Sequence, residues 1–297
     1  MPPSWKESVE HTVLQHPLLE TKPSLAGLRA GREARPETIF MGFGLCTQAR
    51  LTRAVPIDIL GMLLPGEALR RAAGARRIIV LIADRHAVMH HPADGVERCA
   101  RYMQRVLERA SSQLPLGTLE VWRASDFHDE PEFRRRLDHI DELASDEASA
   151  YLLRQVADVD YLQENVGPLL KLGWCLSGRR VHDVSNLYDE RGFDAYVKPL
   201  AGKRPPFVYA KAGRTLNDRR KKAPPYVVAE PERRICLTPE EDPVSKLERV
   251  SKEVSRETYR GVKNHLAAIA KSYADLVPDA ASELDERLEG LVRKLAA

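Results

Sequence analysis

The run Arg77–Asp84 (RIIVLIAD) constrains the fold of this chain more than any other feature. Its aliphatic and β-branched residues follow one another without polar alternation, which is typical of a strand buried on both faces of a parallel sheet. A parallel sheet needs crossover helices on its faces, so the run predicts an α/β architecture rather than an all-β or all-helical one.

The segments around this run repeat the strand–helix order. Thr38–Cys46 indicates a strand that enters a glycine-containing turn, and Leu119–Trp122 indicates a short strand. Apolar residues at helical spacing predict helices over Ile57–Ala73 and Pro92–Gln113. The β–α–β–α–β order predicts a Rossmann-like parallel sheet with right-handed crossovers and a site at the carboxyl ends of its strands.

The remainder of the chain is predicted to be mostly helical. A lead-in segment (residues 1–36), a Rossmann-like domain (37–240) and a C-terminal helical appendage (241–297) form the expected organisation. The expected later elements are helices over Ala148–Val159, Gln163–Leu176, Val244–Tyr273 and Ala281–Leu295, with short strands at Val208–Tyr209 and Tyr226–Val228.

Composition excludes several classes of protein. The 297 residues are 43% apolar and 30% charged, which is ordinary for a globular chain and unlike a disordered or collagen-like one. The longest apolar stretches, Ile78–Ala83 and Ile57–Leu64, are shorter than the ~18–20 residues of a membrane helix. The N-terminus has no apolar core typical of a signal peptide. We therefore expect a cytoplasmic protein without a membrane partner.

The cysteines and histidines do not predict a metal site or a disulfide framework. No CxxC pair is present, and His90 and His91 are adjacent, so these two cannot share one face as an i, i+4 pair does. Glycine motifs for nucleotides and dinucleotides, and the serine elbow of α/β-hydrolases, are also missing. We expect neither metal nor cofactor. The four cysteines are Cys46, Cys99, Cys175 and Cys236.

Charge is segregated along the chain. Residues 126–147 hold nine acids and three arginines, and residues 198–222 hold nine bases and one acid. The basic segment also contains prolines and glycine, so it is predicted to be a loop that presents positive charge to a polyanion. Its candidate contact residues are Lys203, Arg204, Arg214, Arg219, Arg220, Lys221 and Lys222.

Two motifs in order carry a family resemblance. Asp84 and His86 stand in an ADxHA strand end, and Tyr151, Gln155 and Asp158 form a YxxxQxxD pattern. In this order they resemble the catalytic core of tyrosyl- and tryptophanyl-tRNA synthetases, from about residue 38 to about residue 245. The resemblance implies that ADxHA lies beside an amino-acid pocket and that the YxxxQxxD helix binds the amino group of the substrate.

The ATP signatures of that family are absent. Its His-Ile-Gly-His motif corresponds here to Val55-Pro56-Ile57-Asp58, and its Lys-Met-Ser-Lys-Ser loop corresponds to Leu216–Lys222 (LNDRRKK). Adenylate formation needs preorganised donors on the phosphate charge that develops in the transition state. The sequence therefore argues against ATP-dependent activation of an amino acid.

A synthetase-like core without these signatures resembles cyclodipeptide synthases, which take activated amino acids from aminoacyl-tRNAs. That class places a nucleophilic serine after the first strand in a GxSxxN setting. Here Gly44, Thr47 and Gln48 surround Cys46 at the serine position, and the asparagine is missing. A Cys46 thiolate would accept the aminoacyl group as a thioester if its pKa were lowered. Thr47 as nucleophile, a merely buried Cys46 and direct transfer without a covalent intermediate stay open.

Two pairs of residues are candidates for handling the amino group, as the resemblance implies. They are Tyr151 with Gln155, and Tyr161 with Glu164. In the second pair Glu164 would act as the general base; the alternative is that Tyr161 and Glu164 lie on an exposed helix face.

Acidic residues are predicted to line the substrate pocket. Asp189 and Glu190 would join Asp84 and Asp158, and such a pocket suits a cationic side chain such as that of arginine.

The leading hypothesis is an aminoacyl-tRNA-dependent aminoacyltransferase that forms peptide bonds, most simply a cyclodipeptide synthase of natural product biosynthesis. Its partner would be aminoacyl-tRNA, with the basic loop on the phosphates of the acceptor arm. An ATP-dependent adenylating paralogue and a non-catalytic tRNA-binding protein are the alternatives. Whether the chain forms a homodimer stays open.

Overall fold

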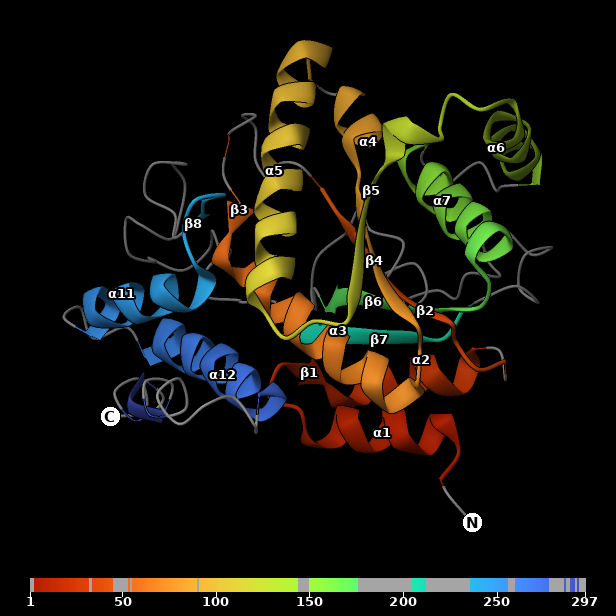
Figure 1. Ribbon diagram of the computed structural model, residues 1–297. Helices are drawn as coiled ribbons and strands as arrows, with labels where there is room; N and C mark the ends of the chain where they lie inside the picture. The colour runs from red at the N-terminus through yellow and green to blue at the C-terminus, as the bar shows by residue number, and fades with distance from the viewer. Residues whose placement is uncertain are drawn as a thin grey trace.

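The computed structural model describes residues 3–31, 34–44, 53, 55–89, 91–143, 150–175, 205–211, 236–255 and 260–277, and positions 286, 289–291 and 293. A six-stranded sheet forms its centre, in the order β1-β7-β6-β2-β4-β5 (Figure 1). All neighbouring strands are parallel except β1, which is antiparallel to β7. The strands are β1 (Leu19–Glu20), β2 (Thr38–Phe43), β4 (Arg77–Ile82), β5 (Thr118–Arg123), β6 (Leu169–Cys175) and β7 (Phe207–Lys211).

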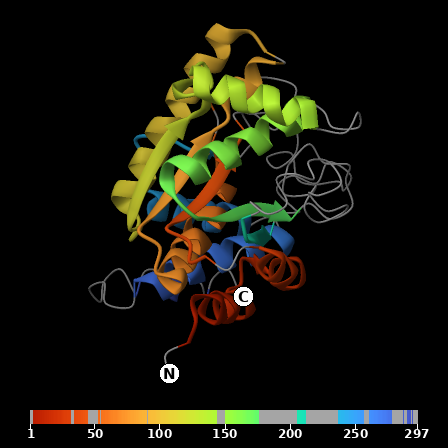
Figure 2. The ribbon, with the colours of Figure 1, turned by 90° about the vertical axis from the view of Figure 1, so that its right-hand side faces the viewer.

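The central strand β4 is buried on both faces, as its apolar run predicts. Ile78, Val80 and Ile82 belong to the core under helices α3 (Leu60–Ala73) and α5 (Ala93–Gln113). Ile79 and Leu81 belong to the second core, under α6 (Pro131–Leu143) and α7 (Ala150–Val166). Figure 2 shows α6 and α7 on their own side of the sheet. The α/β Rossmann-like fold expected from the sequence is confirmed.

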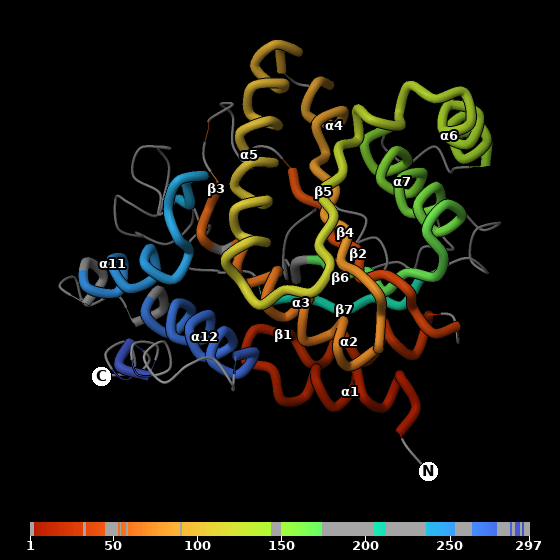
Figure 3. The backbone as a smooth tube through the Cα atoms, viewed as in Figure 1, coloured from red at the N-terminus to blue at the C-terminus, as the bar shows by residue number. Residues whose placement is uncertain are grey.

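Residues 1–36 contribute to the sheet itself. Helix α1 (Trp5–Gln15) begins at a capping box in which Ser4 and Glu7 exchange hydrogen bonds. It packs against α3, and the short strand β1 extends the sheet beyond β7 before α2 (Thr21–Ala30) begins. The tube in Figure 3 shows α1 and α2 together below the sheet.

Two helical predictions are wrong in part. Residues 163–176 do not form one helix, because α7 ends at Val166 and β6 occupies Leu169–Cys175. Gly167, with φ +85°, and Pro168 lie between them and end the helix. The stretch 244–273 is divided between α11 (Pro243–Ser255) and α12 (Arg260–Leu276), which pack against each other. Both helices bury apolar residues in the same core, so their periodicity does not reveal the break.

Small elements complete the described part of the chain. Strand β3 (Val55–Pro56) pairs with β8 (Cys236–Leu237) and leads through the 3₁₀ turn η1 (Ile57–Ile59) into α3. Helix α4 (Asp84–Val88) follows β4, and the turn η2 (Ala124–Asp126) follows β5. Among the described residues, no helix has the length and apolarity needed to cross a membrane.

Candidate active site

The carboxyl ends of β2 and β4 form an open edge of the sheet. Gly42 lies on the same face of β2 as Phe40, which is the α7 side, because residues two apart in a strand share a face. Gly42 and Gly44 are exposed, and a Cβ atom at either position would meet open space. The backbone of β2 therefore leaves room for a ligand on the side where α7 lies.

Asp84, at the end of β4, is buried and its two carboxylate oxygens are fully engaged. Oδ1 accepts from the backbone N–H groups of Arg85 and Ser125, at 2.8 Å each. Oδ2 accepts from Ser125 Oγ at 2.6 Å and from two nitrogens of Arg123, at 2.9 and 3.0 Å. Arg123 also binds Glu97, and these bonds to Glu97 and Asp84 raise the pKa of the guanidinium although burial opposes them. Asp84 therefore links the end of β4 to Arg123 of β5 and, through Arg123, to Glu97 of α5.

A cluster of two histidines and one carboxylate lies on the other side of the same strand end. His86 in α4, His128 after η2 and Asp158 in α7 are each 5% exposed or less. His128 Nε2 lies 2.5 Å from Asp158 Oδ1, and His86 Nε2 lies 3.5 Å from Asp158 Oδ2. His128 stacks on Phe133, with 4.0 Å between the ring centroids. One carboxylate therefore faces two imidazoles from different elements.

Burial lowers the pKa of His86 to about 4, because the imidazolium would lose its hydration. Asp158 acts in the opposite direction and His128 and Arg154 add to the decrease, but all three effects are smaller than that of burial. His86 is consequently neutral at pH 7. Within the described part of the chain, neither ring nitrogen of His86 has a hydrogen-bond partner, and Nδ1 of His128 has none either.

Tyr151 and Gln155 are next to this cluster on α7. Residues at positions i, i+4 and i+7 share one helix face, so both lie on the face of Asp158. The ring of Tyr151 stands edge-on to His86, with centroids 5.1 Å apart. The structure thereby brings together four residues of the two sequence motifs: His86, Tyr151, Gln155 and Asp158.

Tyr161 and Glu164 lie elsewhere on the same helix. Ten residues of helix separate Tyr161 from Tyr151, which is ~15 Å along the axis. Tyr161 stacks on Phe127 and donates its hydroxyl to Glu130 at 2.7 Å; burial first, and then Glu130, raise its pKa to about 12. Glu164 binds Arg136 at 2.5 Å, at the packing surface between α6 and α7. The two candidate pairs for the amino group are therefore far apart.

The other candidate residues lie outside the described part of the chain. They comprise the proposed nucleophile Cys46 with Thr47 and Gln48, the acids Asp189 and Glu190, the basic loop residues Lys203, Arg204, Arg214, Arg219, Arg220, Lys221 and Lys222, and the segment Tyr226–Val228.

Sequence reasoning missed His128 and Arg123. Neither belongs to a local motif, and Arg123 and His128 lie 46 and 51 residues after the start of β4 at Arg77. The available signal was that residues following parallel strands gather at the same edge of the sheet. Among the described residues, no group of three or more histidine, cysteine or acidic side chains is arranged to hold a metal ion.

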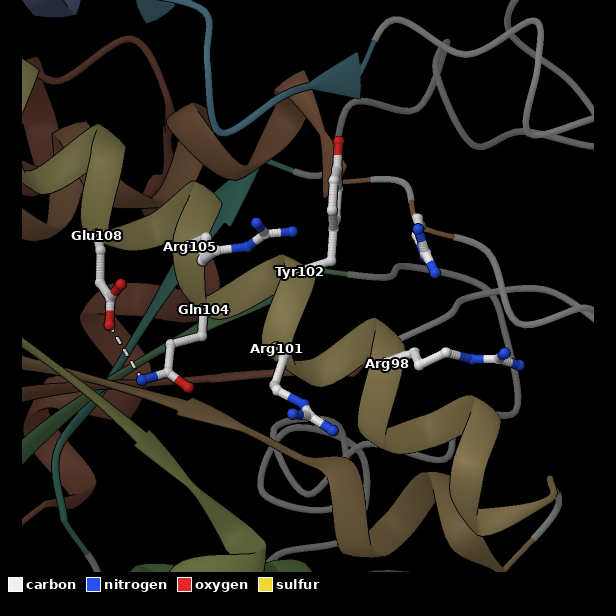
Figure 4. A pocket seen from close by; sticks show the side chains of 7 residues that line it. Arg98, Arg101, Tyr102, Gln104, Arg105 and Glu108 are labelled. Atoms are coloured by element: carbon white, nitrogen blue, oxygen red, sulfur yellow. Dashed lines mark hydrogen bonds between the residues drawn. The ribbon is translucent and has the colours of Figure 1, made fainter.

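A basic surface on α5 was also missed. Arg98, Arg101 and Arg105 project from successive turns and, with Arg53, line a hollow of about 510 Å³ (Figure 4). Tyr102 forms part of its wall, and the guanidinium of Arg105 lies 6.0 Å from the centroid of that ring. The spacing of three and four residues places these arginines on one helix face.

The fold is that of class I tyrosyl- and tryptophanyl-tRNA synthetases. A tyrosyl-tRNA synthetase from Archaeoglobus fulgidus in complex with L-tyrosine superposes with a TM-score of 0.57 at 11% identity, covering 98% of this chain and 92% of the other. The corresponding enzyme from Pyrococcus horikoshii gives 0.53 at 13% identity, covering 98% and 94%. A tryptophan-bound tryptophanyl-tRNA synthetase from Encephalitozoon cuniculi gives 0.51 at 12% identity, covering 88% and 78%.

These identities are low, so the likeness establishes the fold alone. No model of a known protein family matches the chain, and no curated protein resembles it in sequence.

Proposed function

We propose that this protein is an aminoacyl-tRNA-dependent aminoacyltransferase that forms peptide bonds, most simply a cyclodipeptide synthase acting in the cytoplasm. The observation that carries the proposal is the structure of the segment where a synthetase would bind ATP. The fold is that of a synthetase, and the segment in question forms the short strand β3 and the start of the turn η1, with Val55 and Ile57 buried.

Strand β3 offers no groups suited to a triphosphate. Val55 and Ile57 are buried, and Val55 pairs with Leu237 of β8. Pro56 has no N–H to donate. Stabilising the phosphate charge that develops during adenylate formation would need donors here, and apolar side chains within a two-stranded ladder do not supply them. An amino acid that is already esterified to tRNA removes this requirement.

The α5 surface supports a nucleic-acid partner. Its arginines are exposed on successive turns, and one aromatic ring, Tyr102, lies among them. Arginines contact backbone phosphates, and an aromatic ring stacks on an unpaired base, as at the single-stranded end of a tRNA. The basic loop around Arg219–Lys222 would add to this surface.

The proposed step needs no cofactor. The amine of one aminoacyl group attacks the ester carbonyl of another; a C–N bond forms, the C–O bond to the tRNA breaks, and the proton lost by the amine ends on the departing 3′-oxygen. Tyr151 and Gln155 would position the amine beside the open face of Gly42. Glu164 would act as base only if its pair with Arg136 opens. An acidic pocket would favour a basic substrate such as arginine.

Expression in bacteria followed by mass spectrometry of the medium tests the proposal. Cyclic dipeptides are the expected products, and purified protein should form them from aminoacyl-tRNA without ATP. Amino-acid-dependent ATP–pyrophosphate exchange would show an adenylating enzyme instead. Retention of tRNA without either activity would show a binding protein.

Variants at two cysteines test for a covalent intermediate. Cys46→Ala should abolish product if a thioester forms, whereas Cys99→Ala, at a buried position in α5, should not. Near-normal turnover by the Cys46 variant would show that the two substrates react directly.

A further inference from the structure

The His86–Asp158–His128 cluster contains hydrogen-bonding capacity that the described part of the chain does not use. Buried polar atoms in folded proteins are nearly always paired, and those that are not call for an explanation. Among the described residues, Nδ1 of His86 is buried without a hydrogen-bond partner, and Nε2 has only its 3.5 Å contact with Asp158. The cluster also borders Tyr151, on the side of the sheet where Gly42 leaves open space.

The position of Asp158 determines which nitrogen of His86 carries the proton. His86 is neutral, so one ring nitrogen is a donor and the other an acceptor. Nε2 faces the carboxylate at 3.5 Å and is therefore the N–H, because a carboxylate can only accept. Nδ1 is then left as an acceptor, with a negative charge behind the ring.

Such an acceptor prefers a positively charged donor. Hydrogen bonds in which one group is charged are about twice as strong as neutral ones, and Asp158 polarises the imidazole toward accepting one. Arg154 acts on His86 through space, yet no described residue donates to Nδ1. His128 keeps Asp158 oriented by its own bond at 2.5 Å, so the carboxylate is fixed before a ligand arrives.

We propose that His86 is a specificity-determining residue whose Nδ1 accepts a hydrogen bond from a cationic N–H group of the aminoacyl substrate. This inference rests on the proposed function, since the cation belongs to an amino acid. Two sources share the required chemistry: the α-ammonium group and a basic side chain such as a guanidinium. Asp158 and His128 are positioning residues, because they set the tautomer and orientation of His86 without contacting the ligand.

Titration with small amides tests this inference without tRNA or turnover. The full-length protein, labelled with ¹⁵N-histidine, is titrated with leucinamide, Nα-acetyl-argininamide and Nα-acetyl-leucinamide. The first carries only an α-ammonium, the second only a guanidinium, and the third no charge. We expect one of the two cationic amides to shift the Nδ1 resonance of His86, and the uncharged amide to leave it unchanged; which cation acts identifies the source.

Variants separate the hydrogen bond from a structural effect. His86→Phe should weaken binding of the active amide by roughly tenfold or more, and His86→Gln, which keeps an acceptor, should restore part of the loss. His265→Phe is the matched control: that histidine also has a pKa of about 4 through burial, but it lies in α12. It should leave binding unchanged.

Three outcomes would overturn the inference. They are an absence of any response of His86 to both cationic amides, an equal response to the uncharged one, and unaltered affinity in folded His86→Phe. If the protein forms no peptide bond while a cationic amide still binds at His86, the proposed function fails and this inference stands.

Discussion

Two buried aspartates flank the end of β4, and they differ in their hydrogen-bond partners. Asp84, toward β5, accepts hydrogen bonds from two backbone amides, a hydroxyl and a guanidinium. Asp158, on α7, accepts one from His128 and faces a second histidine, His86, whose Nδ1 has no hydrogen-bond partner among the described residues. The two carboxylates are almost equally buried, at 2% and 4% exposure. Burial alone therefore does not distinguish them, whereas the pairing of their neighbours does.

The difference teaches which side of the strand end is structural. A carboxylate with every lone pair engaged has nothing left for a ligand, and its removal deprives several donors of their acceptor at once. A carboxylate beside an imidazole with an unused acceptor nitrogen leaves one hydrogen bond to be formed, and a ligand would form it. We therefore expect changes on the Asp84 side to act on folding and changes on the Asp158 side to act on the substrate.

Asp84→Ala should cause the largest effect. It removes the buried acceptor of Arg123, Ser125 and two backbone amides and leaves Arg123 with Glu97 alone, so the free energy of unfolding should fall by about 3–5 kcal/mol. Urea denaturation measures this value. Asp126→Ala, which removes an exposed acceptor for the backbone N–H of Arg123, is the control and should cost about 1 kcal/mol. Equal losses in the two variants would show that the Asp84 side is not the structural one.

His86→Phe should change how stability depends on pH. The pKa of His86 is about 4 in the folded protein and 6.5 in the unfolded chain, so the unfolded state takes up the proton first as pH falls. Stability is lost between pH 6.5 and 4, and a variant without this imidazole should keep on the order of 3 kcal/mol more of its neutral-pH stability at pH 4. Unfolding at pH 7 and pH 4 tests this. If the loss of stability between pH 7 and pH 4 is the same in His86→Phe as in the original protein, His86 is not buried as a neutral group.

Asp158→Asn should lower transfer without comparable unfolding. Losing the charge behind His86 should reduce kcat/KM for aminoacyl transfer by about a hundredfold, while the free energy of unfolding falls by about 1 kcal/mol. Asp160→Asn is matched, because it lies on the same helix and pairs with Arg136. It should leave kcat/KM within about threefold of the original. If both variants behave alike, the contrast between Asp84 and Asp158 has no functional meaning.

Replacing Arg98, Arg101 and Arg105 of α5 together by glutamine should weaken tRNA binding and leave the region around β4 intact. The slope of log K against log salt concentration should become shallower by about two to three, since each lost phosphate contact contributes roughly 0.9. Filter binding at several salt concentrations measures it. Arg134→Gln, an exposed arginine on α6, is the control and should not change the slope. An unaltered slope in the triple variant would remove α5 from the proposed tRNA surface.

The sequence predicted the centre of the fold because its patterns are local. Arg77–Asp84 and the amphipathic helix at 92–113 each carry their own periodicity, and the structure has β4 at Arg77–Ile82 and α5 at Ala93–Gln113. Strand β6 was missed because Leu169–Cys175 contains apolar residues that suit a helix equally well, and only the two residues Gly167 and Pro168 separate it from α7.

The site was harder to predict because its partners come from distant segments. The two motifs predicted that His86 and Asp158 share a site, and in the structure their side chains lie 3.5 Å apart. His128 follows no motif, and its bond to Asp158 depends on how α7 packs beside the turn after β5. The arginines of α5 are spaced as on any solvated helix, so the hollow they line depends on Arg53 from another segment.

The smallest expected effects come from two glycines on opposite sides of β2. On the α3 side, a Cβ at Gly66 would collide with the end of Met41, whereas on the α7 side a Cβ at Gly42 would meet open space. Gly42→Ala should therefore leave the free energy of unfolding unchanged or raise it by about 0.5 kcal/mol, because alanine loses less backbone entropy on folding. Gly66→Ala should lower it by less than about 1 kcal/mol, because the flexible end of Met41 can move aside and alanine suits the interior of α3 better than glycine.

Activity should reverse this order if the open face of β2 holds the substrate. A methyl group at Gly42 would occupy space next to the bound aminoacyl group, so transfer should fall several-fold in a variant that is as stable as the original. Gly66→Ala, assayed well below its melting temperature, should retain its kcat/KM. Full activity of Gly42→Ala would show that the substrate does not lie against β2. A substrate at β2 would then no longer explain why Nδ1 of His86 lacks a partner among the described residues.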